Sequence, residues 1–343
     1  MRTTDRPPRL AVYGIGRYGT DVVRMATAKG WEIVAAYNRA GDKVGQDVGR
    51  LAHLDRDLGV PIEDCDAADY SALGERADIA VVATTDRLVD NMPCFERLLG
   101  AGVNVLSHNT ESYLPRAADP ALGARLHELA ETSGVTFTGS GIWDMSRIWS
   151  GILTAAPCVE ITSLRHESRT NLGVSSKVAH LAGIGFSHDE FRSALVEERG
   201  PIGELYKLIP WHVTQALGYE VTEVVERREP VLLDEPIHAA GLRRDIPAGE
   251  PAGLRIVVDV STAEGVSAHA RIELRAVEPG QQDFMRWTIE GEPTSTIHVD
   301  RQVGPPGSAT SLINRVEDVI AAPPGIQEVH RLGPPRHSAL ALR

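Results

Sequence analysis

The sequence predicts a two-domain α/β protein, with an N-terminal doubly wound parallel sheet followed by a C-terminal α+β domain whose sheet is largely antiparallel. Three observations support this fold class. The chain has 343 residues, more than one typical domain of about 100–200 residues needs. Short apolar runs alternate with helical patterns as far as residue 145. After residue 150, strand-like segments instead follow one another with turns between them.

The apolar runs of the first half are rich in β-branched residues and lack the alternation of half-exposed strands. They cover residues 10–14, 32–38, 79–85, 103–108 and 135–140. Between them, apolar side chains recur at helical spacing over residues 20–28, 88–99 and 119–132. Strands that are apolar on both faces belong to a parallel sheet covered by helices on both sides. We therefore predict a doubly wound domain over residues 1–145.

The second half predicts a domain of a different kind, over residues 146–305. Its strand-like segments are residues 159–168, 254–262, 266–277, 285–289 and 295–299. Residues 238–253 are rich in Pro, Gly, Arg and Asp and are expected to form a surface loop. A late helical pattern over residues 309–322 stops at a Pro-Pro-Gly sequence. We expect this helix to pack back on the first domain and complete it.

Charge and composition exclude several classes of partner. Acidic residues outnumber basic ones by 47 to 35, and the formal charge of −12 argues against nucleic acid or an anionic membrane as a partner. The three cysteines lie far apart without a C-x-x-C pair, which fits a reducing compartment. The first residues show no secretion signal, and no apolar run approaches the ~20 residues of a membrane span. We therefore expect a cytoplasmic location.

A glycine motif directly follows the first predicted strand and opens the first helix. It consists of Gly14, Ile15, Gly16, Arg17, Tyr18 and Gly19. In such motifs the first glycine permits a tight turn, the second lets the backbone approach a pyrophosphate, and the third permits close packing of helix on strand. The phosphates then lie at the helix N-terminus. The motif predicts a Rossmann domain that binds a dinucleotide; a glycine-rich turn without a cofactor is the alternative.

The end of the second predicted strand bears on which dinucleotide is bound. An acidic residue at this place would bind the ribose 2′-hydroxyl of NAD, but the chain has Asn38 followed by Arg39. An amide does not repel a 2′-phosphate, and a guanidinium can pair with it through two hydrogen bonds. We predict NADP as the cofactor, with NAD as a second possibility. The alternative for Arg39 is a solvated turn arginine.

Four polar residues follow two other predicted strands. Thr84 and Thr85 end one apolar run, while His108 and Asn109 lie at the end of the next. Ligands of parallel sheets bind beyond the carboxyl ends of strands, so these residues are predicted to face the nicotinamide half of the cofactor. The alternatives are threonines that cap the following helix and a structural histidine. No histidines have ligand spacing, and no metal site is predicted.

Five segments in order carry a resemblance to a known family. They are the glycine motif, VGQDVG (44–49), VNVLSHNTESYLP (103–115), TGSGIWD (138–144) and ATSLINRVEDVIAAPPG (309–325). Together they resemble the dihydrodipicolinate-reductase-like oxidoreductases related to 2,4-diaminopentanoate dehydrogenase, which include the native NADP-dependent amine dehydrogenases. The resemblance implies a second domain whose sheet helps to form a homodimer. It also implies a cleft where hydride moves between nicotinamide and an imine or amine carbon.

The resemblance also implies a catalytic residue. In the amine dehydrogenases a glutamate just after the corresponding strand is the acid/base group, and Glu111 is the matching residue here. Converting a carbonyl compound and ammonia into an imine requires proton transfers at nitrogen and at the departing water. The implied substrates are therefore a small carbonyl compound with ammonia, or the corresponding amine. The alternative is a glutamate that occupies the first turn of a helix, where acidic residues are favoured, and has no catalytic role.

One segment departs from the family pattern. Gly141-Ile142-Trp143 stands where the 2,4-diaminopentanoate dehydrogenase group typically carries Asn-Pro-Gly, near the nicotinamide carboxamide and the substrate. Ile142 and Trp143 are predicted to contact the substrate, and Trp143 favours an apolar or aryl one; a core tryptophan is the alternative. Two rival functions remain, a reductase of carbonyl or sugar substrates and a regulatory protein that binds NADP without turnover. Sugar-reducing relatives carry Glu-Lys-Pro here, whereas Ser112 follows Glu111.

The first predicted strand of the second domain contains three candidate anion ligands, Arg165, His166 and Arg169. Strand alternation puts Arg165 and Arg169 on one face and His166 on the other, so the three cannot line one pocket. A charged strand end is the favoured interpretation. The paired histidines and the Lys-x-Asp-x-x-Ser-Gly-Thr sequence of dihydrodipicolinate reductase are missing here. A role in lysine biosynthesis is therefore not predicted.

Overall fold

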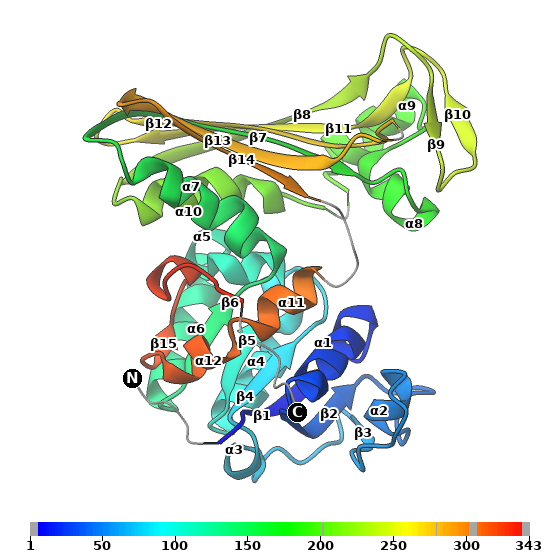
Figure 1. The fold of residues 1–343 in the computed structure, drawn as a ribbon, viewed down its shortest axis with the longest axis vertical. Helices are drawn as coiled ribbons and strands as arrows, with labels where there is room; N and C mark the ends of the chain where they lie inside the picture. The colour runs from blue at the N-terminus through cyan, green and yellow to red at the C-terminus, as the bar shows by residue number, and fades with distance from the viewer. Residues whose placement is uncertain (1–5, 201, 279, 302–306, 338–343) are drawn as a thin grey trace. The chain divides into compact units, whose positions relative to one another are not determined.

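The structure is a computed structural model that describes residues 6–200, 202–278, 280–301 and 307–337 (Figure 1). The chain divides into two compact units. Unit 1 comprises residues 1–145 and 304–343, and unit 2 comprises residues 146–303. The chain therefore leaves unit 1 once and returns to it after unit 2.

Unit 1 is built on a parallel seven-stranded sheet with the strand order β15-β6-β5-β4-β1-β2-β3. The strands are β1 (Arg9–Tyr13), β2 (Glu32–Asn38), β3 (Ile62–Asp64), β4 (Ile79–Val82), β5 (Asn104–Ser107), β6 (Thr136–Gly139) and β15 (Gly325–Ile326). All five predicted strands are confirmed, although β4 ends before the two threonines. The strands β3 and β15 are too short to give a periodic signal. Strand order reverses between β1 and β4, where parallel sheets bind their ligands.

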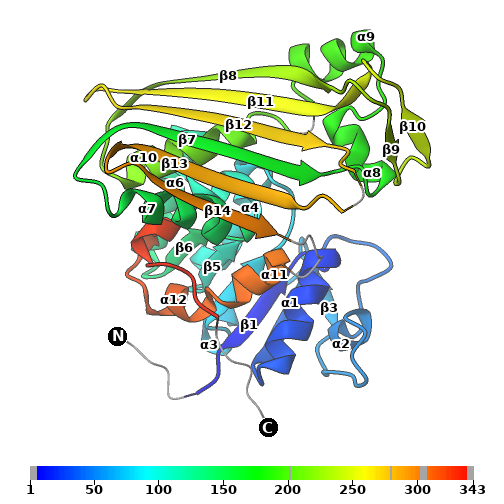
Figure 2. The same cartoon turned by 45° about the horizontal axis from the view of Figure 1, so that its top comes forward.

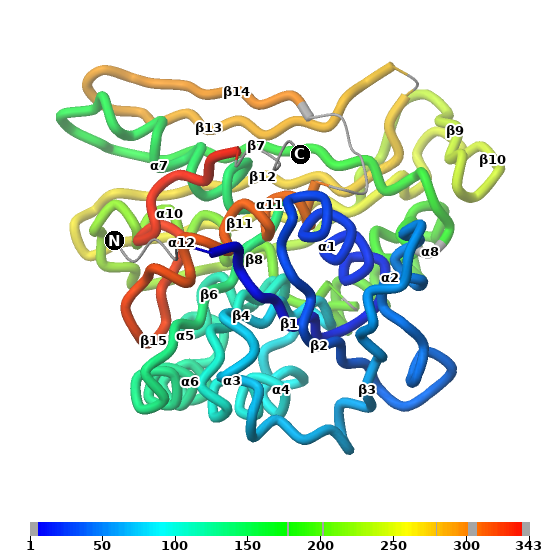
Figure 3. The backbone as a smooth tube through the Cα atoms, turned by 60° about the horizontal axis from the view of Figure 1, so that its bottom comes forward, coloured from blue at the N-terminus to red at the C-terminus, as the bar shows by residue number. Residues whose placement is uncertain are grey.

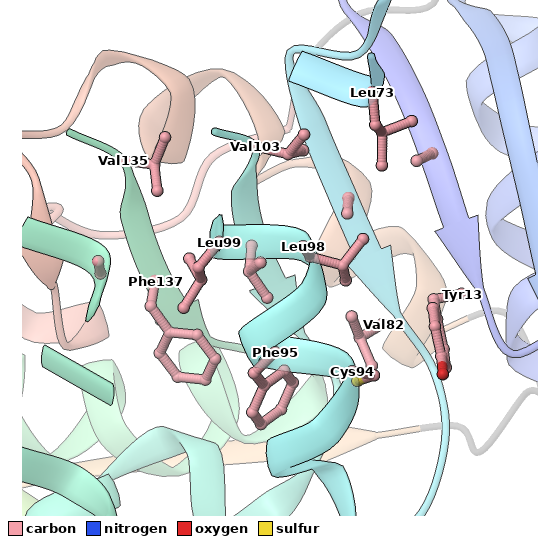
Figure 4. Packing of buried hydrophobic residues seen from close by; sticks show 14 of the residues in the cluster. Tyr13, Leu73, Val82, Cys94, Phe95, Leu98, Leu99, Val103, Val135 and Phe137 are labelled. Carbon is pink, nitrogen blue, oxygen red and sulfur yellow. The ribbon is translucent and has the colours of Figure 1, made fainter. Parts of the chain in front are cut away.

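Helices cover both faces of this sheet, as the doubly wound prediction requires. The longer ones are α1 (Arg17–Ala28), α4 (Leu88–Gly100) and α6 (Pro120–Thr132), and the shorter ones are α2 (Val48–Leu51), α3 (Leu73–Arg76) and α5 (Pro115–Ala118). Phe95 of α4 packs edge-on against Phe137 of β6, with ring centroids 4.9 Å apart (Figure 4). Such buried contacts hold α4 and α6 against one face of the sheet.

The late helical pattern forms two helices, so the prediction of one helix over residues 309–322 was wrong in this respect. The helices are α11 (Gly307–Ile313) and α12 (Val316–Ala321). Both pack on the sheet face that also carries α1, and α11 lies beside α1 (Figure 3). The helix breaks at Asn314 and Arg315, where the fully buried Arg315 side chain turns inward to reach Asp144.

Unit 2 contains a six-stranded sheet with the strand order β14-β13-β7-β12-β11-β8 (Figure 2). Its strands are β7 (Glu160–Asn171), β8 (Val221–Leu232), β11 (Pro251–Thr262), β12 (Ser267–Arg275), β13 (Asp283–Glu292) and β14 (Ser295–Arg301). Only β7 and β12 pair in parallel, which confirms a largely antiparallel sheet. Helices α7 (Ser150–Ala155) and α10 (Leu208–Ala216) lie on one face (Figures 1 and 2).

Two parts of unit 2 differ from the prediction. The edge strand β8 was not predicted, because charged residues interrupt its apolar pattern, as is common at sheet edges. The expected loop at residues 238–253 contains most of a hairpin, β9 (Ile237–Ala239) and β10 (Arg244–Ile246), and the start of β11. Three-residue strands separated by Gly and Arg carry too little periodicity to be recognised. Within the described ranges, no helix is long and apolar enough to cross a bilayer.

Candidate active site

A cavity of about 820 Å³ opens in unit 1 at the carboxyl ends of β1, β2 and β4. These ends meet where the strand order reverses, the ligand-binding place of doubly wound sheets. Six predicted cofactor-binding residues line the cavity, namely Gly14, Gly16, Asn38, Arg39, Thr84 and Thr85. The structure therefore brings the glycine motif and the ends of β2 and β4 together around one cavity.

The three motif glycines differ in what surrounds them. Gly14 has a φ of +93°, and a Cβ there would lie 2.5 Å from the carbonyl oxygen of Ala83. A Cβ on Gly19 would lie 2.1 Å from the carbonyl oxygen of Gly14. Gly16 is the N-cap of α1, and a Cβ there would meet nothing within 4 Å. Gly14 and Gly19 are thus required by the fold, whereas Gly16 leaves open space where a phosphate group can approach the backbone.

The end of β2 braces the glycine motif and adds positive charge to the cavity. Asn38 accepts a hydrogen bond from the backbone N–H of Ile15 through Oδ1, at 3.2 Å. Lys43, which the sequence did not suggest, lines the cavity and donates from Nζ to the carbonyl oxygen of Ile15. Arg39 is exposed and makes no ion pair within the described part of the chain. Two cations therefore stand at this side of the cavity. Arg17 is exposed at the start of α1 and is not among the lining residues.

Thr84 and Thr85 do not cap α4, so that alternative is not supported. The N-cap position of α4 is Arg87, which makes no side-chain capping bond. Both threonines instead interact with the side chain of Asn91, on the first turns of α4. Asn109, only 1% exposed, donates to Thr84 Oγ1 at 3.2 Å. Asn109 therefore supports the cavity wall from behind, and it does not line the cavity.

Glu111 lies in a 3₁₀ turn, η1 (Thr110–Tyr113), directly after β5. The side chain is half-buried, and its Oε2 accepts a hydrogen bond from the backbone N–H of Leu88 at 2.6 Å. The turn is pressed against β6, since a Cβ on Gly139 would lie 2.1 Å from the carbonyl oxygen of Ser112. No other donor among the described residues reaches the Glu111 carboxylate. One carboxylate oxygen is therefore anchored at the start of a 13-residue helix. Glu111 is not among the residues that line the 820 Å³ cavity.

His108 and Tyr113 lie close to Gly141, in the segment that follows β6. The His108 ring stacks on Tyr18 with ring centroids 4.3 Å apart. Burial lowers the pKa of His108, against a weaker opposing effect of Asp86, so the imidazole is neutral at pH 7. A Cβ on Gly141 would lie 3.1 Å from Tyr113 Oη and 3.4 Å from His108 Cδ2. His108 and Tyr113 thus lie close to Gly141, whereas Tyr18 contacts the His108 ring. Neither His108 nor Tyr18 lines the cavity.

Ile142 and Trp143 follow Gly141 and are half-buried. The Trp143 ring lies 5.9 Å from the Tyr113 ring, and Ile142 Cδ1 would be 3.0 Å from a Cβ on Gly307. Trp143 is therefore not a fully buried core residue. Both side chains keep an accessible apolar surface on unit 1, outside the 820 Å³ cavity.

A buried ion pair holds the end of this segment. Asp144 and Arg315 are fully buried and joined by two hydrogen bonds, Nε to Oδ2 at 2.6 Å and Nη2 to Oδ1 at 2.9 Å. The hydroxyl of Ser140 donates to Asp144 at 2.8 Å, and Arg315 also donates to the carbonyl oxygen of Gly333 at 2.7 Å. Residues 141–143 are thus held at both ends, at β6 and at the turn between α11 and α12.

Comparisons with known proteins extend the resemblance seen in the sequence. No protein-family model matches the chain. The chain is 24% identical to 2,4-diaminopentanoate dehydrogenase from Acetoanaerobium sticklandii, over 96% of this chain and 94% of the relative. Among solved structures it matches the amine dehydrogenase of Mycobacterium smegmatis with a TM-score of 0.82 and 29% identity, covering 97% of this chain and 98% of that one. The resemblance predicted from the sequence is therefore confirmed.

The chain is an oxidoreductase of the amine dehydrogenase kind. Both relatives are dehydrogenases of CH–NH₂ groups by name, which confirms the predicted enzyme class. A weaker match to GenD2 from gentamicin A biosynthesis, in complex with NAD, has a TM-score of 0.52 and 17% identity. It covers 87% of this chain and 73% of that one, and it shows a shared fold.

The charged strand β7 contributes packing and ion pairs to unit 2. His166 is fully buried, while Arg165 lies on the opposite face and pairs with Glu290 at 3.2 Å. Arg169 shares the face of Arg165, where its guanidinium lies 5.2 Å from the ring of Phe284. The predicted alternation is therefore confirmed.

Proposed function

We propose that the protein is an NADP-dependent amine dehydrogenase. It would aminate a ketone or aldehyde with ammonia, or oxidatively deaminate the corresponding amine. The observation that carries this proposal is the Glu111 carboxylate, which one hydrogen bond anchors in the turn after β5 while its second oxygen stays available. The similarity to two dehydrogenases of CH–NH₂ groups supports the same reaction type.

The cofactor proposal rests on the fit of the cavity to a dinucleotide with a 2′-phosphate. Gly14 and Gly16 would bring the backbone N–H groups at the start of α1 to the pyrophosphate. Arg39 and Lys43 supply positive charge, and Asn38 supplies no negative charge, beside the expected ribose. When bound, the nicotinamide ring gives a hydride to the substrate carbon or takes one from it. NAD is the alternative cofactor for the same cavity.

The proposed role of Glu111 is to carry protons during imine formation. Addition of ammonia to the carbonyl carbon gives a carbinolamine, from which water must leave. Glu111 would accept a proton from the nitrogen and deliver a proton to the departing hydroxyl, so that one carboxyl group serves both transfers. The hydrogen bond from Leu88 N–H to Oε2 would hold the carboxylate in one orientation, with Oε1 as the atom that exchanges the proton. No metal takes part in the proposed reaction.

The proposed substrate is an apolar or aryl carbonyl compound. Trp143 and Ile142 are half-buried and keep part of their apolar surface accessible on the segment that follows β6. An indole ring contributes a large apolar area with a defined orientation. We expect Trp143→Ala to raise KM for an aryl ketone about tenfold or more, with a smaller effect for a short aliphatic ketone. Equal effects on both substrates would contradict this role.

Ammonia dependence tests the proposed reaction. The protein is mixed with NADPH and a panel of ketones and aldehydes, with and without ammonia, and NADPH absorbance is followed. An amine dehydrogenase oxidises NADPH only when ammonia is present. Oxidation without ammonia would instead identify a carbonyl or sugar reductase. NADPH binding without oxidation, seen by cofactor fluorescence across a broad substrate panel, would favour the regulatory alternative.

We also propose a homodimer that acts in the cytoplasm. The face of the unit 2 sheet opposite α7 and α10 carries interleaved charges of both signs, such as Arg286 paired with Glu167 and Arg227 paired with Asp259. Such a face can match a second copy of itself around a two-fold axis. All three cysteines are unpaired, which supports a reducing compartment.

A further inference from the structure

Asn91 occupies a position that the amphipathic pattern of α4 would assign to an apolar residue. It lies one helical turn after the buried Leu88 and one turn before the buried Phe95, and it is only 3% exposed. A buried amide costs free energy unless its hydrogen bonds are satisfied. The contacts of Asn91 therefore indicate what this side chain does.

The Asn91 amide binds the loop between β4 and α4 at several points. Its Oδ1 accepts a hydrogen bond from Thr84 Oγ1. Its Nδ2 contacts the carbonyl oxygen of Thr85 at 3.0 Å, the Thr85 hydroxyl at 3.1 Å and the carbonyl oxygen of Arg87 at 2.6 Å. One side chain thus holds the whole loop that leads to the Leu88 N–H, the donor to Glu111.

The same chain of hydrogen bonds continues to the turn that carries Glu111. Thr84 Oγ1 accepts from Asn109 Nδ2 at 3.2 Å, and Asn109 Oδ1 accepts from the Ser107 hydroxyl. The Ser107 and Ser112 hydroxyls lie 3.0 Å apart. Because Ser107 already donates its only hydrogen to Asn109, Ser112 must donate to Ser107. The chain thus runs in one direction from Ser112, the neighbour of Glu111, to Asn91.

We propose that Asn91 is a positioning residue for catalysis, which acts through Glu111 by holding the Leu88 N–H and the Glu111 turn in register. The chain of side chains and the bond between Leu88 N–H and Glu111 Oε2 connect the same two loops, so they close a ring. Asn91, Asn109, Ser107 and Ser112 are all at least 97% buried, and satisfied buried networks of this kind specify one geometry. This inference rests on the proposed role of Glu111.

Amide hydrogen exchange of the free protein tests the structural part of this inference. We expect Asn91→Ala to speed exchange by about tenfold in two segments distant in sequence, residues 84–90 and residues 107–113. Phe95→Leu is the matched control, because it removes buried volume from the same helix without touching the hydrogen-bond chain. It should affect α4 but not residues 107–113. Unchanged exchange of residues 107–113 in Asn91→Ala would overturn the proposal.

Turnover kinetics test whether Asn91 acts through Glu111. Asn91→Ala should lower kcat about 10- to 100-fold, since misplacing a catalytic group by about 1 Å has effects of this size. In a Glu111→Gln background the same change should alter the residual single-turnover rate less than about threefold, because the group being positioned is already inactive. Asn91→Asp, which lacks the Nδ2 donor, should behave like Asn91→Ala. Equal losses in both backgrounds would overturn the proposal.

Failure of the inference on Asn91 can be distinguished from failure of the proposed function of Glu111. If Glu111→Gln turned over normally, the role of Glu111 would be wrong, and the positioning role would fall with it. If Glu111→Gln were inactive while Asn91→Ala kept full turnover, only the inference on Asn91 would be wrong.

Discussion

At the scale of single residues, two glycines of the same motif have different roles, one in folding and the other in cofactor binding. A methyl group on Gly19 would collide with the Gly14 carbonyl oxygen, whereas one on Gly16 would meet no protein atom. We expect Gly19→Ala to destabilise the protein by about 1–3 kcal/mol, as overpacking does. Gly16→Ala should cost less than about 1 kcal/mol but weaken NADPH binding. Denaturant unfolding and cofactor titration of both variants check this, and equal losses of stability would contradict it.

Cofactor choice is also decided by individual side chains. Arg39 and Lys43 stand at the side of the cavity where the 2′-phosphate is expected. A charge-assisted hydrogen bond of about 1.5–3 kcal/mol corresponds to roughly 10- to 100-fold in affinity. Arg39→Ala should raise KM for NADPH by such a factor and leave KM for NADH nearly unchanged. Lys43→Met should raise KM for NADPH as well, and it should also affect NADH because it removes the hydrogen bond to the carbonyl oxygen of Ile15 in the glycine motif. A lower KM for NADH than for NADPH in the unaltered protein would contradict the NADP proposal.

At the scale of secondary-structure elements, a buried ion pair connects the segment after β6 to the returning helices α11 and α12. Asp144 and Arg315 are fully buried and form two hydrogen bonds with each other. Removing Arg315 leaves the buried Asp144 carboxylate without its cation, which typically costs about 3–5 kcal/mol. Arg315→Met should therefore destabilise the protein strongly, while Arg315→Met combined with Asp144→Leu should recover part of the loss. Thermal unfolding of the single and double variants provides the measurement.

Asp78, in the turn before β4, ties the start of β1 to the sheet and should contribute a pH dependence of stability. Burial alone would raise its pKa, but hydrogen bonds from Arg6 and Arg9 outweigh this and lower the pKa to about 2. A depressed carboxyl pKa stabilises the fold above the unfolded value of about 3.9, and this contribution is lost as the pH falls toward 2. Asp78→Asn should reduce the stability change between pH 4 and pH 2, by up to about 1 kcal/mol. An unchanged pH profile would contradict this.

Elements with strong periodicity could be predicted from the sequence, and weak ones could not. The parallel strands and helices α1, α4 and α6 carry long apolar patterns, and their observed bounds follow these patterns closely. The hairpin of β9 and β10 and the charged edge strand β8 lack such a pattern, and tertiary pairing decides their structure. The break between α11 and α12 depends on the partner of Arg315, 171 residues away in sequence. A local sequence pattern cannot predict that contact.

The candidate site shows the same division. Motif residues such as Gly14, Asn38 and Thr84 were predicted because each follows a recognisable strand. Lys43 was not, since its role depends on a contact with the glycine motif 28 residues away. Asn91 was not either, since the network that its loop contacts belong to reaches the Glu111 turn only through Asn109, which is distant in sequence. The sequence does contain one indication of the role of Asn91, because its polar amide interrupts the apolar stripe of α4. Such an interruption indicates a buried hydrogen-bond network.

At the scale of the whole molecule, the charged face of the unit 2 sheet opposite α7 and α10 underlies the proposed association. A homodimer built on interleaved ion pairs should weaken as salt screens the charges. Sedimentation at increasing salt should therefore show a dimer whose dissociation constant rises. A monomer at every protein and salt concentration would contradict the proposed assembly.

Glu111 is proposed to carry the protons of the amination reaction. The Glu111→Gln variant tests this most directly, because the amide oxygen can still accept the hydrogen bond from Leu88 N–H while the side chain can no longer transfer a proton. NADPH binding and ammonia-dependent NADPH oxidation are measured for the variant and the unaltered protein. We predict a dissociation constant for NADPH within about threefold and a turnover rate at least about 100-fold lower, in the range of general acid–base catalysis. Unchanged turnover with normal NADPH binding would contradict the proposed role of Glu111.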